Sequence, residues 1–212
     1  MQSQSQGTVS STLHFIEGLN FIVIGESQAE GIESAMGDCR FSFAWTLSGA
    51  LGLNLINLAK GGSMLLDPGP LGGPEQLIQA NALIPQSADT IFWMAGYNDA
   101  ARYGTDLTYL AQFRIQFASA VLRLAQGSAQ VFIAPPFLGL YALKDPTGHN
   151  NYVNAVTEVI EQLNLPNVAL INTDSIFTPT ATDWKSDGAH LNPAAEARLG
   201  QAFLEQIQMG EH

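Results

Sequence analysis

Short apolar runs alternate along the chain with longer segments in which apolar residues recur every three or four positions. Five runs, each rich in β-branched or aromatic residues, are typical of buried strands: 19–25, 53–59, 90–96, 129–135 and 167–173. Most are almost continuously apolar rather than alternating, as expected of parallel strands covered on both faces.

The segments between these runs have the periodicity of amphipathic helices. Apolar stripes predict helices over 41–51, 75–83, 106–125, 150–164 and 193–208. Asp38 is the expected N-cap of the first of these helices, and Asn192, followed by Pro193, the expected N-cap of the last. Alternating strands and helices indicate right-handed crossovers, and therefore an α/β fold with helices on both faces of a parallel sheet.

Length and composition fit one domain of this class. The chain has 212 residues, and we expect a single domain over 13–212 after a disordered polar tail over 1–12. Hydrophobic residues make up 46 % of the chain and charged residues only 13 %, so Asn, Gln, Ser and Thr must cover much of the surface. Cys39 is the single cysteine, which excludes an intramolecular disulfide.

The charge argues against several classes of partner. A net charge of −11 disfavours nucleic acid and anionic membranes, whose recognition depends on Lys and Arg. No run approaches the length of a transmembrane helix, so membrane insertion is not expected. The N-terminal residues lack a signal pattern, which fits a cytoplasmic protein or a secreted one whose signal has been removed. The sequence does not indicate an oligomeric state.

Residues capable of chemistry follow the predicted strands directly. Gly25-Glu26-Ser27 comes after the first strand, "KGGSM" after the second and "GYND" after the third, while "DGAH" stands shortly before the last helix. In open parallel sheets, ligands bind outside the carboxyl ends of the strands. The sequence therefore predicts a site at this edge.

Ser27 and His190 are the candidates for nucleophilic chemistry. A serine needs a base, the base needs an orienting partner, and the developing oxyanion needs donors. His190 lies three residues after Asp187, a spacing that suits a turn in which the carboxylate reaches one imidazole nitrogen. Taken alone, Ser27 also fits an ordinary turn serine and His190 a capping histidine.

Together the four blocks resemble those of the SGNH hydrolases, also called GDSL esterases. Gly25-Glu26-Ser27 matches the nucleophile block apart from Glu26, where Asp is usual, and "GYND" and "DGAH" match the third and last blocks in full. Asn57 stands five residues before Gly62, the spacing seen in the second block. The resemblance covers residues 20 to about 205.

The resemblance implies a flavodoxin-like three-layer α/β/α fold with strand order 2-1-3-4-5. It implies Ser27 as nucleophile, His190 as general base and acid, and Asp187 as its orienting partner. The implied oxyanion hole consists of the Ser27 and Gly62 backbone N–H groups and the Asn98 side-chain amide, with Gly61 as the alternative to Gly62. No metal or other cofactor is required by such a mechanism. The acid at position 26 has a mainly structural role in the family.

The expected substrate is a small-molecule or glycan ester. The first third of the chain resembles the carbohydrate O-acetylesterase branch, and no long apolar lid is evident, which favours acetyl groups over long acyl chains. The candidates for lining the substrate site are Met64, Tyr97, Phe137 and Trp184. A lysophospholipase, thioesterase or acyltransferase would use the same triad, so these alternatives remain open.

Two further alternatives fit less well. A catalytically inactive glycan-binding module would be expected to lack the serine, histidine or asparagine, and all three are present. The α/β-hydrolase elbow Gly-x-Ser-x-Gly is absent at Ser27, and Asp187 and His190 lie close together near the C-terminus.

Overall fold

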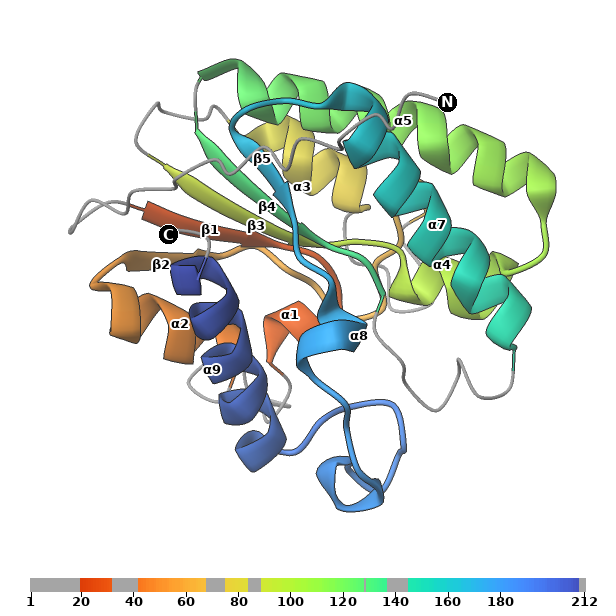
Figure 1. The fold of residues 1–212 in the computed structure, drawn as a ribbon. Coiled ribbons are helices and arrows are strands. Elements are labelled where there is room, and N and C mark those ends of the chain that lie inside the picture. Colours follow the sequence, from red (N-terminus) through yellow and green to blue (C-terminus); the bar gives the residue numbers. More distant parts are fainter. Residues whose placement is uncertain are drawn as a thin grey trace, which may run out of the picture.

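A five-stranded parallel sheet forms the centre of the molecule (Figure 1). The structure is a computed structural model and describes residues 20–31, 42–67, 75–83, 89–127, 129–136 and 145–209. Its strands are β1 (Asn20–Ile24), β2 (Asn54–Asn57), β3 (Thr90–Met94), β4 (Gln130–Ala134) and β5 (Val168–Leu170). They lie in the order β2-β1-β3-β4-β5, which confirms the predicted order.

Successive residues of the inner strands point into two separate cores. Phe21, Phe92 and Phe132 face one core, while Ile22, Ile91 and Val131 face the other. Strand pairing keeps this alternation aligned, because Ile22 pairs with Ile91, and Ile91 with Val131. Burial on both faces explains why these strands are almost continuously apolar in sequence.

Helices cover both faces of the sheet. The helices are α1 (Ser27–Glu30), α2 (Phe43–Leu51), α3 (Gln76–Ala82), α4 (Tyr97–Tyr103), α5 (Leu107–Leu124), α7 (Pro146–Leu163), α8 (Thr173–Ile176) and α9 (Pro193–Met209). Figure 1 shows α2 and α9 on one face and α3, α5 and α7 on the other. The two helix layers contribute the apolar side chains that complete the two cores.

Several helix boundaries differ from the prediction. Ser42, not Asp38, caps α2, since its hydroxyl accepts a hydrogen bond from the Trp45 N–H at 3.3 Å. Helix α7 begins at Pro146, four residues earlier than predicted, because Asp145 caps it and proline is tolerated in the first turn. Helix α4 was not predicted, since its short sequence carries no clear apolar stripe. Asn192 caps α9 as predicted, by accepting from the Ala195 N–H at 3.0 Å.

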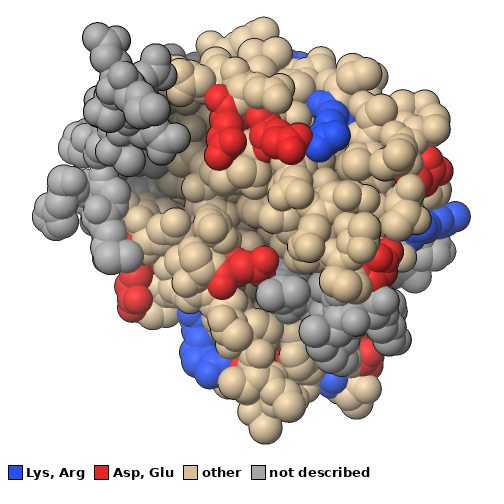
Figure 2. All heavy atoms as spheres, turned by 45° about the vertical axis from the view of Figure 1, so that its right-hand side comes forward, with Lys and Arg blue, Asp and Glu red and all other residues tan. Residues whose placement is uncertain are grey.

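The surface charges and the helices of the described residues bear on which partners the protein can bind. The face in Figure 2 carries scattered acidic and basic side chains among many uncharged ones. Within the described ranges, no helix is long and apolar enough to cross a membrane. The predicted tail over 1–12, Asp38 and Cys39 lie outside the described residues.

Candidate active site

The sharp turn after β1 presents Ser27 at the carboxyl edge of the sheet. Gly25 has φ +145°, and a Cβ atom there would lie 2.8 Å from the Met94 carbonyl oxygen at the end of β3. Only glycine allows the two strand ends to approach so closely. The chain then enters α1 at Ser27, which places the hydroxyl above the end of the central strands.

His190 connects Ser27 to Asp187 through two short hydrogen bonds. Its Nε2 lies 2.9 Å from the Ser27 Oγ, and its Nδ1 lies 2.7 Å from the Asp187 Oδ2. If Nδ1 carries the proton, it donates a hydrogen bond to the Asp187 carboxylate, and Nε2 is free to accept the serine proton. The structure thus brings together three predicted residues from opposite ends of the chain in the geometry of a serine nucleophile and its base.

The loop that carries His190 is closed on itself. Trp184 and Leu191 form an antiparallel bridge, and the Lys185 N–H donates to the His190 carbonyl at 2.8 Å. Gln28, buried beside the nucleophile, donates its side-chain amide to the Ala189 carbonyl at 2.7 Å. The loop is therefore attached to α1 next to Ser27, which fixes the distance between base and nucleophile.

Asp187 is held in its charged form. Partial burial raises the pKa of its carboxyl, but hydrogen bonds from the His190 ring and from the Ala189 and His190 N–H groups outweigh this and lower the pKa to about 2. The Asp187 Oδ1 accepts from these two N–H groups at 2.8 and 3.0 Å. Asp187 is consequently a carboxylate at neutral pH.

The two candidate glycines lie in the turn after β2 and differ in the hydrogen bonding of their N–H groups. The Gly61 N–H donates to the Glu30 Oε2 at 2.7 Å, so it is already occupied. No described residue accepts a hydrogen bond from the Gly62 N–H. Gly62 has φ +75°, and the Ser63 N–H closes the turn on the Lys60 carbonyl at 3.1 Å. These contacts favour Gly62 over Gly61 as an oxyanion donor.

Asn98 lies in the first turn of α4 and contacts the same loop. Its Nδ2 donates to the Ser63 carbonyl at 3.0 Å. A side-chain amide has two N–H donors, so this bond leaves one for a ligand. Asp99, the next residue, accepts the Leu65 N–H at 3.0 Å, and α4 thereby holds the loop that contains Gly62 at two points.

The structure describes three of the four residues predicted to line a substrate site, and these three differ in burial. Met64 is 1 % exposed and Tyr97 6 % exposed, so both offer little surface in this conformation. Trp184 is partly buried against the core formed with α2 and α9. Phe137 lies outside the described residues. For all four, contact with substrate stays a prediction.

Glu26 is buried directly beside the nucleophile. It is 1 % exposed, and neither of its carboxyl oxygens has a hydrogen-bond partner among the described residues. Burial, with the charges of Asp99 and Glu196, raises its pKa well above the usual value. The raised pKa favours the protonated, uncharged form of Glu26.

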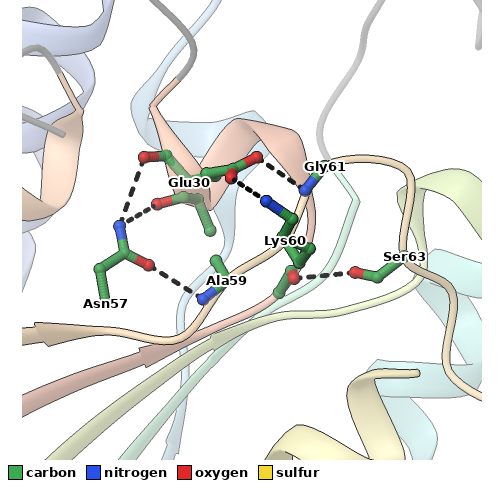
Figure 3. A network of polar contacts seen from close by, with 8 residues as sticks. Glu30, Asn57, Ala59, Lys60, Gly61 and Ser63 are labelled. Carbon is green, nitrogen blue, oxygen red and sulfur yellow. Dashed lines mark hydrogen bonds and ion pairs between the residues drawn. The ribbon is translucent and has the colours of Figure 1, made fainter. Parts of the chain in front are cut away.

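Three residues that contribute to the site were missed in the sequence. Gln28 holds the His190 loop, while Glu30 and Ser63 hold the glycine turn, as the close view in Figure 3 shows for the last two. Each contact joins segments that are more than 30 positions apart. No local sequence pattern signals such pairs. His149 lies buried in the first turn of α7.

The described residues contain no group of three or more His, Cys, Asp or Glu side chains that could hold a metal ion.

Solved structures with similar folds include esterases. TesA matches with a TM-score of 0.68 at 18 % identity, over 90 % of this chain and 99 % of TesA. A variant of Axe2, an acetyl xylan esterase from Geobacillus stearothermophilus, matches with a TM-score of 0.68 at 21 % identity, over 91 % and 96 % of the two chains. The psychrotrophic esterase EstA from Pseudoalteromonas sp. matches with a TM-score of 0.66 at 14 % identity, over 90 % and 97 %.

Sequence comparison identifies the family. A search of curated proteins gave no match. The model of the GDSL-like lipase/acylhydrolase family matches residues 23–198, which span β1, the glycine turn, α4 and the His190 loop. This match covers most of the chain and agrees with the resemblance of its four blocks. The chain therefore belongs to the GDSL-like lipase/acylhydrolase family.

Proposed function

We propose that this protein removes short acyl groups, acetyl above all, from carbohydrate or other small esters through an acyl-enzyme on Ser27. The hydrogen-bonded chain from Asp187 through His190 to Ser27 carries this proposal. It supplies an activated nucleophile, a base within reach of its proton and a charged partner that fixes the imidazole tautomer.

In the proposed mechanism, His190 Nε2 takes the Ser27 proton while Oγ attacks the ester carbonyl. The oxyanion accepts hydrogen bonds from the Ser27 and Gly62 backbone N–H groups and from the Asn98 amide. His190 then gives the proton to the leaving alkoxide, and the acyl group remains on Ser27. A water molecule, deprotonated by His190 in turn, releases the carboxylic acid and restores Ser27.

The preference for short acyl groups is supported by the distribution of exposed apolar side chains. Among the described residues, the large exposed ones lie on α2, β2, α3 and α5 rather than on the loops that carry the site: Trp45, Ile56, Ile78, Leu107, Ile115 and Leu122. A long acyl chain would need an apolar surface next to Ser27. The fold similarity to an acetyl xylan esterase agrees with a carbohydrate ester as substrate.

A series of p-nitrophenyl esters tests this proposal. We expect kcat/KM to fall from the acetate through the butyrate and octanoate to the palmitate, and acetylated xylooligosaccharides to release acetate. Ser27→Ala should lower the rate by at least about 10³-fold, because the nucleophile is lost. Faster turnover of the palmitate would contradict the short-acyl preference, and an active Ser27→Ala protein would contradict the assignment of the nucleophile.

A further inference from the structure

Two neighbouring glycines form the turn that presents the candidate oxyanion donor. Gly61 and Gly62 occupy its two central positions, and the turn is closed by the Ser63 N–H on the Lys60 carbonyl at 3.1 Å. The positive φ of Gly62, +75°, is the value a type II turn requires at its third residue. Type I and type II turns differ mainly in the orientation of the central peptide, here the one that contains the Gly62 N–H.

Nothing in the two glycines themselves selects this orientation. Glycine populates positive and negative φ about equally, so a Gly-Gly pair has the greatest backbone freedom of any dipeptide. A reversal of the central peptide would point the Gly62 N–H away from its present side of the turn. An oxyanion donor has to be held in place before reaction, since its effect depends on preorganisation. The turn therefore needs contacts from outside to hold it.

Glu30 supplies the contact on one side of the turn. Its Oε2 accepts the Gly61 N–H at 2.7 Å, and its Oε1 lies 3.3 Å from the Lys60 Nζ (Figure 3). Gly61 is buried, and the Glu30 side chain is 27 % exposed, which limits competition from water. A hydrogen bond from an N–H group to a carboxylate is stronger than one to a neutral acceptor.

Asn57 places Glu30 opposite the turn. Its Nδ2 donates to the Ala29 carbonyl at 2.9 Å and to the Glu30 carbonyl at 3.4 Å, while its Oδ1 accepts the Ala59 N–H at 3.0 Å. Figure 3 shows these bonds joining the end of α1 to the end of β2. Since α1 begins with Ser27, the nucleophile and the turn are held by one continuous network.

We propose that Glu30 is a positioning residue that orients the Gly62 N–H for the oxyanion by holding the Gly61 N–H. This inference rests on the proposed function and deepens it. Lys60 has a lesser part, because its side chain is 55 % exposed and an ion pair at the surface contributes little. Glu30 acts through the backbone and does not touch the reacting atoms.

Variants of Glu30 and Lys60 distinguish the effect of the Gly61–Glu30 hydrogen bond from the effect of the Glu30 charge. Glu30→Ala removes the acceptor, Glu30→Met removes it while filling the space, and Glu30→Gln retains a carbonyl acceptor. Lys60→Met is the matched control, since it removes the ion pair and leaves the Gly61–Glu30 hydrogen bond. Thermal unfolding of each variant shows whether it is folded.

Two readouts report on the oxyanion hole. The first is kcat/KM on p-nitrophenyl acetate. The second is inhibition by phenylboronic acid, whose tetrahedral adduct with a serine places an oxygen where the oxyanion forms. Loss or displacement of an oxyanion donor costs about 10²-fold or more, and we expect about 10- to 100-fold losses of both quantities in Glu30→Ala and Glu30→Met. Lys60→Met should stay close to wild type, and Glu30→Gln should lose less than Glu30→Met because it keeps a neutral, weaker acceptor.

The outcomes distinguish this inference from the proposed function. If Ser27→Ala is inactive while Glu30→Ala and Glu30→Met keep wild-type kcat/KM and boronate affinity, the positioning role of Glu30 is wrong and the function stands. Equal losses in Glu30→Gln and Glu30→Met would assign the effect to charge and would also overturn it. If Ser27→Ala remains active, the proposed function itself fails.

Discussion

At the scale of single residues, Glu26 is the position at which this chain departs from the pattern of its family. The sequence shows the departure but not its physical setting. The structure adds that the carboxyl is buried, lies near the acidic side chains of Asp99 and Glu196, and has no hydrogen-bond partner among the described residues. Burial without a partner favours the protonated form of an acid, because ionisation there is unfavourable.

The neutral state of Glu26 can be tested with Glu26→Gln. The amide has the same shape and no charge at any pH, so we expect kcat/KM close to wild type. The pKa of Glu26 is raised in the folded protein, so its contribution to stability is lost as the pH rises above the usual carboxyl range. Glu26→Gln should therefore have a higher Tm than wild type at pH 8 and a similar Tm at pH 4. A loss of activity comparable to that of Ser27→Ala would show that the carboxylate is needed.

At the scale of elements, helices α9 and α2 are joined by a buried carboxyl. Glu196, in the first turn of α9, accepts the Phe43 N–H of α2 through its Oε2 at 3.1 Å. Burial raises the pKa of Glu196 to about 8, although the Phe43 hydrogen bond and the charge of Lys185 lower it in part. Glu196 thus serves as an acceptor for the start of α2 while carrying a proton at neutral pH.

Substitutions of Glu196 distinguish its role as a hydrogen-bond acceptor from the effect of its raised pKa on stability. Glu196→Ala leaves the Phe43 N–H without its acceptor and should lower the free energy of unfolding by about 1–3 kcal/mol. Glu196→Gln keeps an acceptor. Since the raised pKa makes the native protein lose stability as the pH rises between about 4.5 and 8, Glu196→Gln should reduce that loss. Urea unfolding at several pH values measures both, and an unchanged pH dependence in Glu196→Gln would contradict the buried-acid interpretation.

The elements also show which parts of the fold could be predicted. The five strands and their order followed from apolar runs and family resemblance, because burial on both faces leaves a strong pattern. Helix α4 was missed because it is short and follows Gly96, an N-cap in a left-handed conformation, which resembles an ordinary turn in sequence. The start of α7 was missed because Pro146 and Gly148 are typical of loops, although Asp145 caps the helix there.

At the scale of the whole molecule, the site is formed where segments far apart in the chain meet at one sheet edge. The sequence pointed to Ser27, Asp187 and His190 because each lies within a recognisable block. It could not locate Gln28, Glu30 or Ser63, whose partners are set by the packing of strand ends and loops. The residues that hold the site in place are thus less visible in sequence than those proposed to react.

Covalent trapping tests the central claim, a Ser27 nucleophile activated by His190, most directly. A p-nitrophenyl alkylphosphonate reacts with an activated serine, and intact-mass and peptide mass spectrometry report how many groups are attached and where. We expect one phosphonyl group per chain, on Ser27, with none in Ser27→Ala and greatly slowed labelling in His190→Ala. Labelling of another residue, or equal labelling of the Ser27→Ala protein, would contradict the account.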